Sequence, residues 1–289
     1  FIGKKVVERL SLFDYDVLIL GRNIPRLLKN KKLKWVKADL SNQQSYKHVV
    51  EEFAPEIVIH LAWQDIPDFS FKTSLENQIS SITFLDLVTR LPCCKKILVS
   101  GSCWEFNQYK DECVENKLVT PQNYFTWAKN SICHWLQVRC KERDIAYAWF
   151  RIFFAYGPGQ RKDALLPQLF KSLINRQLPV ILTPLDANDF IFVEDIAEAF
   201  LIAINKKFSS GIYNLGSGSS TRIIDFSKLV EGIVSGSQKL SDDILNKNKN
   251  KKGSINFWAS TIKTKTNLGW EAKTSLIKGV KLTLNQERF

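Results

Sequence analysis

The strongest constraint on the fold is a regular alternation, through the first half of the chain, of short apolar runs and longer amphipathic stretches. Short runs rich in valine, isoleucine and leucine are typical of strands buried on both faces, and apolar residues at helical spacing indicate helices that cover a sheet. The sequence therefore predicts an α/β fold with a doubly wound parallel sheet. We expect strands at Asp16–Leu20, Leu33–Val36, Ile57–His60, Lys96–Ser100 and Ala146–Arg151, and helices at Gln43–Phe53, Phe71–Arg90 and Asn123–Glu142.

The pattern becomes less regular after Arg151. We expect a glycine and proline loop at Tyr156–Gly159, a helix at Ala164–Asn175, a short segment at Phe190–Val193, a helix to about Asn205 and a segment at Gly211–Asn214. The sequence thus predicts a larger domain over residues 1–155, to which some later segments return, and a smaller mixed lobe over residues 156–289. The Asn- and Lys-rich stretch near residue 248 has the composition of a locally disordered segment.

Composition excludes several classes of protein. With 289 residues, of which 45% are hydrophobic and 24% charged, the chain has the make-up of a globular enzyme. No run approaches the roughly 20 apolar residues that span a bilayer, so we expect no membrane partner. The first residues, Phe1–Lys5, lack the apolar core of a secretion signal, and we expect a cytoplasmic protein.

The cysteines and histidines do not have the spacing of a metal site. The six cysteines include no C-x-x-C pair, and the histidines are His48, His60 and His134. We therefore expect no metal ion, and free thiols in keeping with a reducing compartment. His60, at a strand end, is expected to pack in the core.

A net charge of +12 raises the question of nucleic-acid binding, because lysine and arginine neutralise phosphates. The lysines gather in two runs, at residues 29–34 and 247–252, and neither run carries aromatic residues for base stacking. We expect solvated loops there and no nucleic-acid partner. A basic surface would still attract an anionic substrate such as a nucleotide diphosphate.

A series of short motifs follows in a fixed order along the chain. They are Asp39–Leu40, Ile59–Ala62, Ser100–Phe106, Pro121–Lys129, Arg151–Gln160, Ala187–Ala197, Gly211–Gly218 and Leu268–Trp270. Each alone is a common turn or strand end, but their order is specific. Together they resemble the extended short-chain dehydrogenases/reductases of the NAD-dependent epimerase/dehydratase family, which modify nucleotide-linked sugars. The resemblance implies a Rossmann-type sheet with a smaller substrate-binding lobe.

The resemblance also implies which residues hold the cofactor. Phe1–Gly3 resembles the end of the family's T-G-x-x-G-F-I-G segment, so we expect the first strand and the Gly-rich turn to be missing, with Gly3 left from the pyrophosphate cradle. The other matching positions are Asp39 and Leu40 beside the adenine, Leu61 and Ala62 along the cofactor, and Phe154 by the nicotinamide.

The end of the second expected strand bears on the choice of cofactor. Enzymes that prefer NAD place a carboxylate there against the ribose, whereas those that prefer NADP tend to place an arginine near the 2′-phosphate. Leu18–Arg22 contains no carboxylate and ends in Arg22. We expect NADP, with NAD left open.

The catalytic residues implied by the resemblance are Ser102, Lys129 and a tyrosine. Ser102 matches the hydroxyl that polarises a substrate carbonyl, and Lys129 matches the lysine that holds the ribose and lowers the pKa of the phenol. The family's tyrosine stands four residues before this lysine, where the chain has Phe125. Tyr124 is one position early, and residues i and i+5 of a helix point about 140° apart.

Three explanations of this departure stay open. Tyr124 could donate the proton if the helix begins with an irregular turn, another donor such as Ser102 or a bound water could suffice, or the chain could be a non-catalytic binder, because phenylalanine is no acid.

The reaction follows from what is missing. The family's 4,6-dehydratases carry an Asp-Glu pair where this chain has Cys103 and Trp104, and the histidine of the 3,5-epimerases has no counterpart after Pro158. We therefore expect an NAD(P)-dependent oxidoreductase that reduces a 4-keto sugar nucleotide. The alternatives are a nucleotide-sugar 4-epimerase of the same family and a non-catalytic dinucleotide-binding protein.

The resemblance implies further contacts. Cys103, Gln160 and Asn188, the last at a place where arginine is usual, would face the nucleotide-sugar substrate. The family also implies a homodimer through the helices at Phe71–Arg90 and Asn123–Glu142. Phe84, Trp127 and Trp135 are the residues that we expect to pack there.

Overall fold

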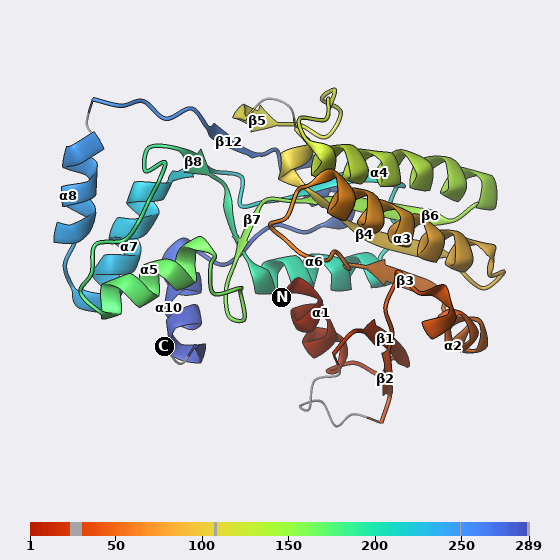
Figure 1. Ribbon diagram of the computed structural model, residues 1–289. Helices are drawn as coiled ribbons and strands as arrows, with labels where there is room; N and C mark the ends of the chain where they lie inside the picture. The colour runs from red at the N-terminus through yellow and green to blue at the C-terminus, as the bar shows by residue number, and fades with distance from the viewer. Residues whose placement is uncertain (24–30, 107–108, 249, 288–289) are drawn as a thin grey trace.

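The computed structural model describes residues 1–23, 31–106, 109–248 and 250–287. Its larger domain is built on parallel strands (Figure 1). One sheet has the strand order β10-β6-β4-β3, and a second pairs β1 with β2. The strands are β1 (Val17–Gly21), β2 (Leu33–Lys37), β3 (Ile57–His60), β4 (Lys96–Ser102), β6 (Ala146–Ile152) and β10 (Gly211–Leu215).

Helices cover both faces of the four-stranded sheet, which confirms the predicted doubly wound α/β fold. On one face α3 (Phe71–Arg90) packs against α4 (Tyr124–Arg143), with α2 (Lys47–Phe53) and the short 3₁₀ helix η1 (Gln43–Ser45) beside them. On the other face α1 (Ile2–Leu10) packs against α6 (Val193–Asn205), with α9 (Ile262–Leu268) nearby. A separate apolar core fills each side.

The central strands are apolar on both faces, as the sequence pattern requires. In β4, Ile97 and Val99 enter the core under α3 and α4, while Leu98 enters the core under α1 and α6, and all three are fully buried. Because alternate side chains of a strand point to opposite faces, a continuous apolar run satisfies two helical layers at once.

The sheet is described in two pieces. Among the residues that the structure describes, no strand pairs with the second edge of β3 or with that of β1. Leu18 and Leu20 of β1 nevertheless pack against the core that contains Val58 of β3. Side-chain packing therefore joins the two sheets on the face covered by α3.

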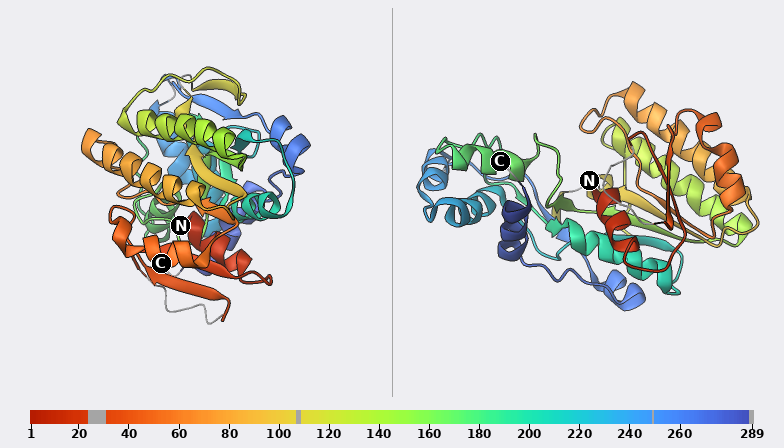
Figure 2. Two further views of the ribbon diagram at one scale, coloured as in Figure 1. Left: turned by 90° about the vertical axis from the view of Figure 1, so that its right-hand side faces the viewer. Right: turned by 90° about the horizontal axis from the view of Figure 1, so that it is seen from below.

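The smaller lobe lies at one end of the larger domain (Figure 2). Its core contains Tyr156, Phe190, Phe192 and Phe226, contributed by β7 (Phe154–Tyr156), β9 (Phe190–Phe192) and α7 (Ile223–Ser235). The lobe's other helices are α5 (Leu165–Ile174), α8 (Lys239–Asn248) and α10 (Leu276–Gln286). A mixed sheet of order β11-β8-β12-β5 joins Thr221–Arg222, Ala187–Asn188, Asn256–Ala259 and Lys110–Cys113.

Some expected segments differ in the structure. The helix expected at Gln43–Phe53 is divided at Tyr46 into η1 and α2. In the stretch near residue 248, which was expected to be disordered, α8 runs to Asn248, and residues 251–253 have no regular secondary structure. Of the two lysine runs, Lys29 and Lys249 lie outside the described residues, and the described lysines are exposed. In the described part of the chain, no helix is long and apolar enough to cross a membrane.

Candidate functional site

The predicted site residues follow the carboxyl ends of the parallel strands. Arg22 follows β1, Asp39 comes shortly after β2, Leu61 follows β3, and Ser102 ends β4. Because the strands are parallel within each sheet, Arg22 and Asp39 follow the carboxyl edge of the β1–β2 sheet, and Leu61 and Ser102 that of the four-stranded sheet. In open α/β sheets, ligands bind at this edge. This carboxyl edge is the candidate site.

Arg22 and Asp39 lie close enough to interact through their charges. Hydrogen bonds from the backbone and hydroxyl of Ser41, at 2.9 and 2.8 Å, lower the pKa of Asp39, and the charge of Arg22 lowers it further. Arg22 is exposed. Leu40 packs in the core under α3, and its carbonyl accepts a hydrogen bond from Tyr46 at 3.5 Å.

Gly3 lies beside the turn that follows β3. A Cβ atom built on Gly3 would be 3.8 Å from Cδ1 of Leu61, so the first turn of α1 and this turn are neighbours. Leu61 is half-buried and Ala62 is exposed. The structure therefore brings two of the predicted cofactor residues together, Gly3 and Leu61.

Lys129 reaches the carboxyl end of β4 from α4. Its Nζ donates a hydrogen bond to the carbonyl of Ser100 at 2.8 Å, and the indole of Trp63 covers it at 4.2 Å. The residue is 6% exposed. Burial lowers the pKa of Lys129 to about 8, and the charge of Glu105 opposes this effect. Sequence reasoning missed Trp63, which stands where the family's H-L-A-A turn has a small residue.

Ser102 starts the 3₁₀ helix η2 (Cys103–Glu105) that follows β4. Its hydroxyl oxygen accepts a hydrogen bond from the backbone of Trp104 at 3.2 Å. Its own backbone N–H donates to Glu105 at 2.7 Å. A serine hydroxyl that accepts one hydrogen bond keeps its proton for another partner, so Ser102 can donate to a ligand oxygen.

Tyr124 does not converge with Lys129 in the structure. Asn123 and Thr126 form a regular capping box, so α4 begins without the irregular turn that Tyr124 would need. The Tyr124 ring is 53% exposed and packs edge-on against Phe71, with 5.2 Å between the ring centroids.

Phe125 takes the inner position instead. It is 5% exposed and packs against Trp63 at 5.1 Å and Phe69 at 4.9 Å. Phe125 and Lys129, four residues apart, share the face of α4 that meets Trp63.

The predicted substrate residues have different surroundings. Cys103 is 2% exposed in the core under α1 and α6, and burial raises the pKa of its thiol, so it does not face an open site. Gln160 donates to the carbonyl of Ala155 at 3.0 Å, while its own amide oxygen is buried without a described partner. The amide oxygen of Asn188 is in the same condition. Buried oxygens without a partner are uncommon in folded proteins, which sets these two amides apart from the other buried groups.

Phe154 joins the two parts of the molecule. Its ring packs against Trp104 at 5.6 Å and Phe190 at 6.1 Å, and its backbone N–H donates to the carbonyl of Asp189 at 3.0 Å. Phe154 is therefore placed between the turn after β4 and the smaller lobe.

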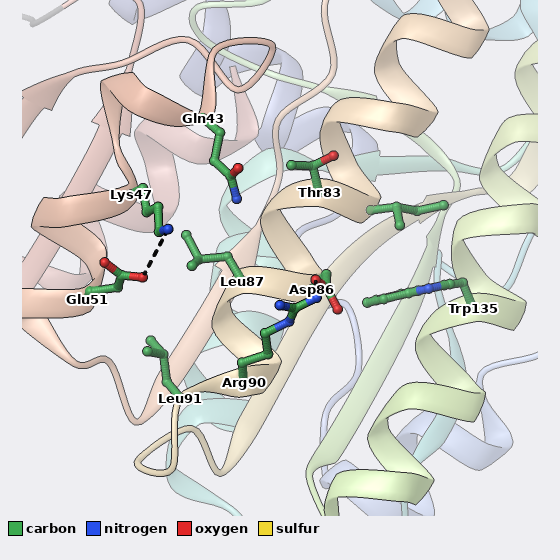
Figure 3. Close-up of a pocket in the computed structure, with 10 residues that line it drawn as sticks. Gln43, Lys47, Glu51, Thr83, Asp86, Leu87, Arg90, Leu91 and Trp135 are labelled. Atoms are coloured by element: carbon green, nitrogen blue, oxygen red, sulfur yellow. Dashed lines mark ion pairs between the residues drawn. The ribbon is translucent and has the colours of Figure 1, made fainter.

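The structure also contains a pocket of about 460 Å³ (Figure 3). It is lined by residues of η1, α2, α3 and α4, among them Lys47, Glu51, Arg90 and Trp135, and Lys47 pairs with Glu51 at 4.0 Å. None of the predicted site residues lines it. Its charged groups are largely paired with one another, which gives it no evident ligand.

Comparison with known proteins identifies the scaffold. Residues 1–216 match the model of the NAD dependent epimerase/dehydratase family. The chain belongs to that family. The match confirms the expected family and the expectation of a nicotinamide-dependent enzyme scaffold.

Relatives extend the match over nearly the whole chain. It is 25% identical to UDP-glucuronate 4-epimerase of Thermodesulfobacterium geofontis (strain OPF15) over 98% of this chain and 88% of that one. It is 27% identical to dTDP-4-dehydro-6-deoxyglucose reductase of Escherichia coli over 81% of this chain and 78% of that one. A crystal structure of UDP-glucuronic acid 4-epimerase from Bacillus cereus in complex with NAD has the same fold, with a TM-score of 0.83, 20% identity and coverage of 99% and 95%.

Proposed function

We propose that the chain is an NAD(P)-dependent oxidoreductase that reduces the 4-keto group of a nucleotide-linked sugar, or catalyses the reverse oxidation. The observation that carries the proposal is the buried Lys129 ammonium at the carboxyl end of β4. It donates to the carbonyl of Ser100, which stands two residues before Ser102 in that strand. One relative named as a 4-keto sugar reductase and two named as 4-epimerases support the substrate class.

The residues of the carboxyl edge fit a dinucleotide. An ammonium has three N–H groups, and Lys129 directs one to Ser100, so a ribose hydroxyl is a suitable acceptor for another. Gly3, Arg22, Asp39, Leu40, Leu61, Ala62 and Phe154 would hold the remainder. When bound, the nicotinamide supplies or accepts the hydride. We propose NADP, since the exposed Arg22 suits a 2′-phosphate, although the ionised Asp39 beside it reduces that preference.

The protein's own residues would act on the sugar carbonyl. Ser102 donates a hydrogen bond to the carbonyl oxygen and so favours the negative charge that develops there. Because Phe125 cannot give a proton and Tyr124 points away, we assign proton delivery to Ser102 or to a water that it holds, with the proton replaced from solvent. Gln160 and Asn188 would hold the nucleotide sugar through their unpaired amide oxygens.

The test is turnover by the purified chain. It would be mixed with NADPH or NADH and a set of 4-keto and 4-hydroxy nucleotide sugars, with reduced cofactor followed by absorbance and products by mass spectrometry. We expect cofactor oxidation with a 4-keto substrate and its loss in Lys129→Ala. Full turnover by Lys129→Ala would refute the assignment. Interconversion of 4-epimers without net cofactor oxidation would favour the 4-epimerase.

A second candidate is a non-catalytic protein that binds a dinucleotide and a nucleotide sugar. The burial of Phe125 against Trp63, together with the exposure of Tyr124, favours it, because no phenol is placed beside Lys129. Calorimetric binding of both ligands with no product after prolonged incubation would identify this case.

We also propose a homodimer through the outer faces of α3 and α4. Phe71 and Ile79 of α3 and Tyr124 and Val138 of α4 are exposed large apolar residues. Phe84 was expected to contribute, but it is buried and packs against Tyr46. Sedimentation of the wild type against Ile79→Glu would test this interface. The cysteines are all free, and we propose a cytoplasmic location.

A further inference from the structure

We propose that the buried carboxylate of Glu105 is a positioning residue of this site, which fixes the backbone of Ser102 and keeps the Lys129 ammonium charged. The inference rests on the proposed function, since it concerns the same two residues. It adds a residue that no motif assigns: the family stretch S-S-S-x-x-V-Y-G has valine where this chain has Glu105.

Glu105 lies fully inside the protein and accepts hydrogen bonds from three groups. They are the Ser102 backbone N–H at 2.7 Å, the indole N–H of Trp149 at 3.0 Å and Nε of Arg151 at 3.0 Å. The pair with Arg151 is buried on both sides. A buried ion pair with satisfied hydrogen bonds is costly to break, so the carboxylate is held in one place.

Gly101 makes room for this arrangement. A Cβ atom there would collide with Nε1 of Trp149 and lie 2.6 Å from a carboxylate oxygen of Glu105. The family motif has serine at this place. The chain therefore combines a missing side chain at 101 with a carboxylate at 105, and the two changes fit each other.

The indole of Trp149 connects the carboxylate to Lys129. Its N–H donates to Glu105, and its ring lies 5.9 Å from Nζ of Lys129. The positive charge of Lys129 is buried, and burial lowers its pKa, whereas the negative charge of Glu105 raises it. Glu105 thus opposes the loss of the proton that the ammonium needs to bind a ribose hydroxyl.

Other groups near Lys129 do not supply this charge. Among the described residues, the titratable groups near Lys129 are His60 of β3, Cys133 one turn along α4, and Glu105 of η2 with its partner Arg151 of β6. On α3, Glu76 is exposed and Asp86 pairs with Arg90 and Arg139. Burial keeps His60 and Cys133 neutral, by lowering the pKa of the first and raising that of the second. Arg151 has the same sign as Lys129, so Glu105 supplies the attraction.

The test measures Lys129 directly in the full chain. Protein labelled with ¹³C,¹⁵N-lysine would be titrated by NMR, with the Lys129 signal assigned from Lys129→Arg. In Glu105→Gln, which keeps the side-chain shape, we expect the pKa of Lys129 to fall by about one unit. Glu115→Gln is the matched control, because Glu115 contacts Arg151 through its backbone carbonyl and should leave Lys129 unchanged. If Glu105→Gln is folded and the pKa of Lys129 is unchanged in it, the proposal is overturned.

Glu105→Asp covers the case in which the glutamine variant does not fold. It keeps the charge but cannot span Ser102 and Arg151 together, so we expect a Lys129 pKa within about half a unit of the wild type and turnover reduced about tenfold or more. Wild-type turnover in Glu105→Asp would contradict the positioning of Ser102. If the pKa of Lys129 falls in Glu105→Gln but the wild-type protein shows no turnover, the electrostatic role of Glu105 is supported and the proposed function is refuted.

Discussion

Phe125 and Lys129 contact the same indole, that of Trp63, which lies 5.1 Å from the Phe125 ring and 4.2 Å from the Lys129 ammonium. The position that would carry a proton donor is therefore filled by an apolar ring in contact with the site. The phenolic oxygen that a tyrosine would carry at position 125 is therefore the group that the site lacks for proton transfer.

Phe125→Tyr should increase turnover. A phenol beside a lysine ammonium is a competent acid, and a positioned acid contributes about 10²-fold or more to proton transfer. We expect kcat for a 4-keto nucleotide sugar to rise by about that factor, measured by cofactor absorbance. Tyr124→Phe is the control and should change kcat less than about twofold. Loss of turnover in Tyr124→Phe, with no gain in Phe125→Tyr, would show that Tyr124 is the donor.

Lys129→Met should stabilise the fold and abolish dinucleotide binding. Burial lowers the lysine pKa from 10.5 to about 8, so at pH 7 the folded protein carries a charge that the interior disfavours. Because the unfolded chain keeps that proton to a higher pH, the wild type should gain stability as pH rises from about 8 to 10.5. After allowance for the lost bond to Ser100, we expect a gain of about 1 to 2 kcal/mol at pH 7 in urea unfolding. Lys141→Met, at an exposed position of the same helix, should leave the free energy of unfolding unchanged. A lower free energy of unfolding in Lys129→Met than in the wild type would contradict the prediction.

His60→Phe should make the fold less sensitive to acid. His60 is buried with Nε2 3.0 Å from Ser81, and burial, aided by the charge of Lys129, lowers its pKa from 6.5 to about 3. Between about pH 6.5 and pH 3, His60 is therefore protonated in the unfolded chain but neutral in the folded one, and stability falls as pH drops below about 6.5. At pH 5 this one group should cost about 2 kcal/mol.

Urea unfolding at pH 7 and pH 5 would measure the difference. His48→Gln, at an exposed position, should keep the wild-type acid sensitivity. Equal sensitivity in His60→Phe and wild type would exclude His60 as the cause.

Arg22→Gln should weaken the binding of NADPH more than that of NADH. A guanidinium forms charge-assisted hydrogen bonds to a phosphate that NADH lacks, so we expect about a tenfold rise in the Kd of NADPH and little change for NADH by calorimetry. Arg143→Gln, at the far end of α4, controls for the loss of one positive charge. Equal affinity of the wild type for both cofactors would exclude the role of Arg22.

Much of the fold could be predicted because its signals are local. The run at residues 97–99 shows a strand buried on both faces, and the expected bounds of α3 coincide with the observed Phe71–Arg90. In contrast, β5 and β12 were not predicted. β5 has the sequence Lys110–Cys113, without an apolar pattern, and it is a strand because it pairs with a segment far along the chain.

The candidate site was predicted only in part, for the same reason. Tyr124 was the candidate proton donor, provided that an irregular first turn of the helix re-aimed it, and the regular cap of α4 removes that condition. Glu105 was missed because a glutamate in a turn normally faces solvent. Its role depends on Trp149 and Arg151, which reach it from β6.

The two indoles beside Lys129 give the molecule an optical reporter of its own. Trp63 faces the ammonium, and Trp149 lies between it and Glu105. A charge at such short range shifts the emission of an indole, so deprotonation of the lysine near pH 8 should change the intrinsic fluorescence of the protein. Ligand binding at this edge and protonation of Lys129 could then be followed without a label. The variants Trp63→Phe and Trp149→Phe would separate the emission of the two indoles.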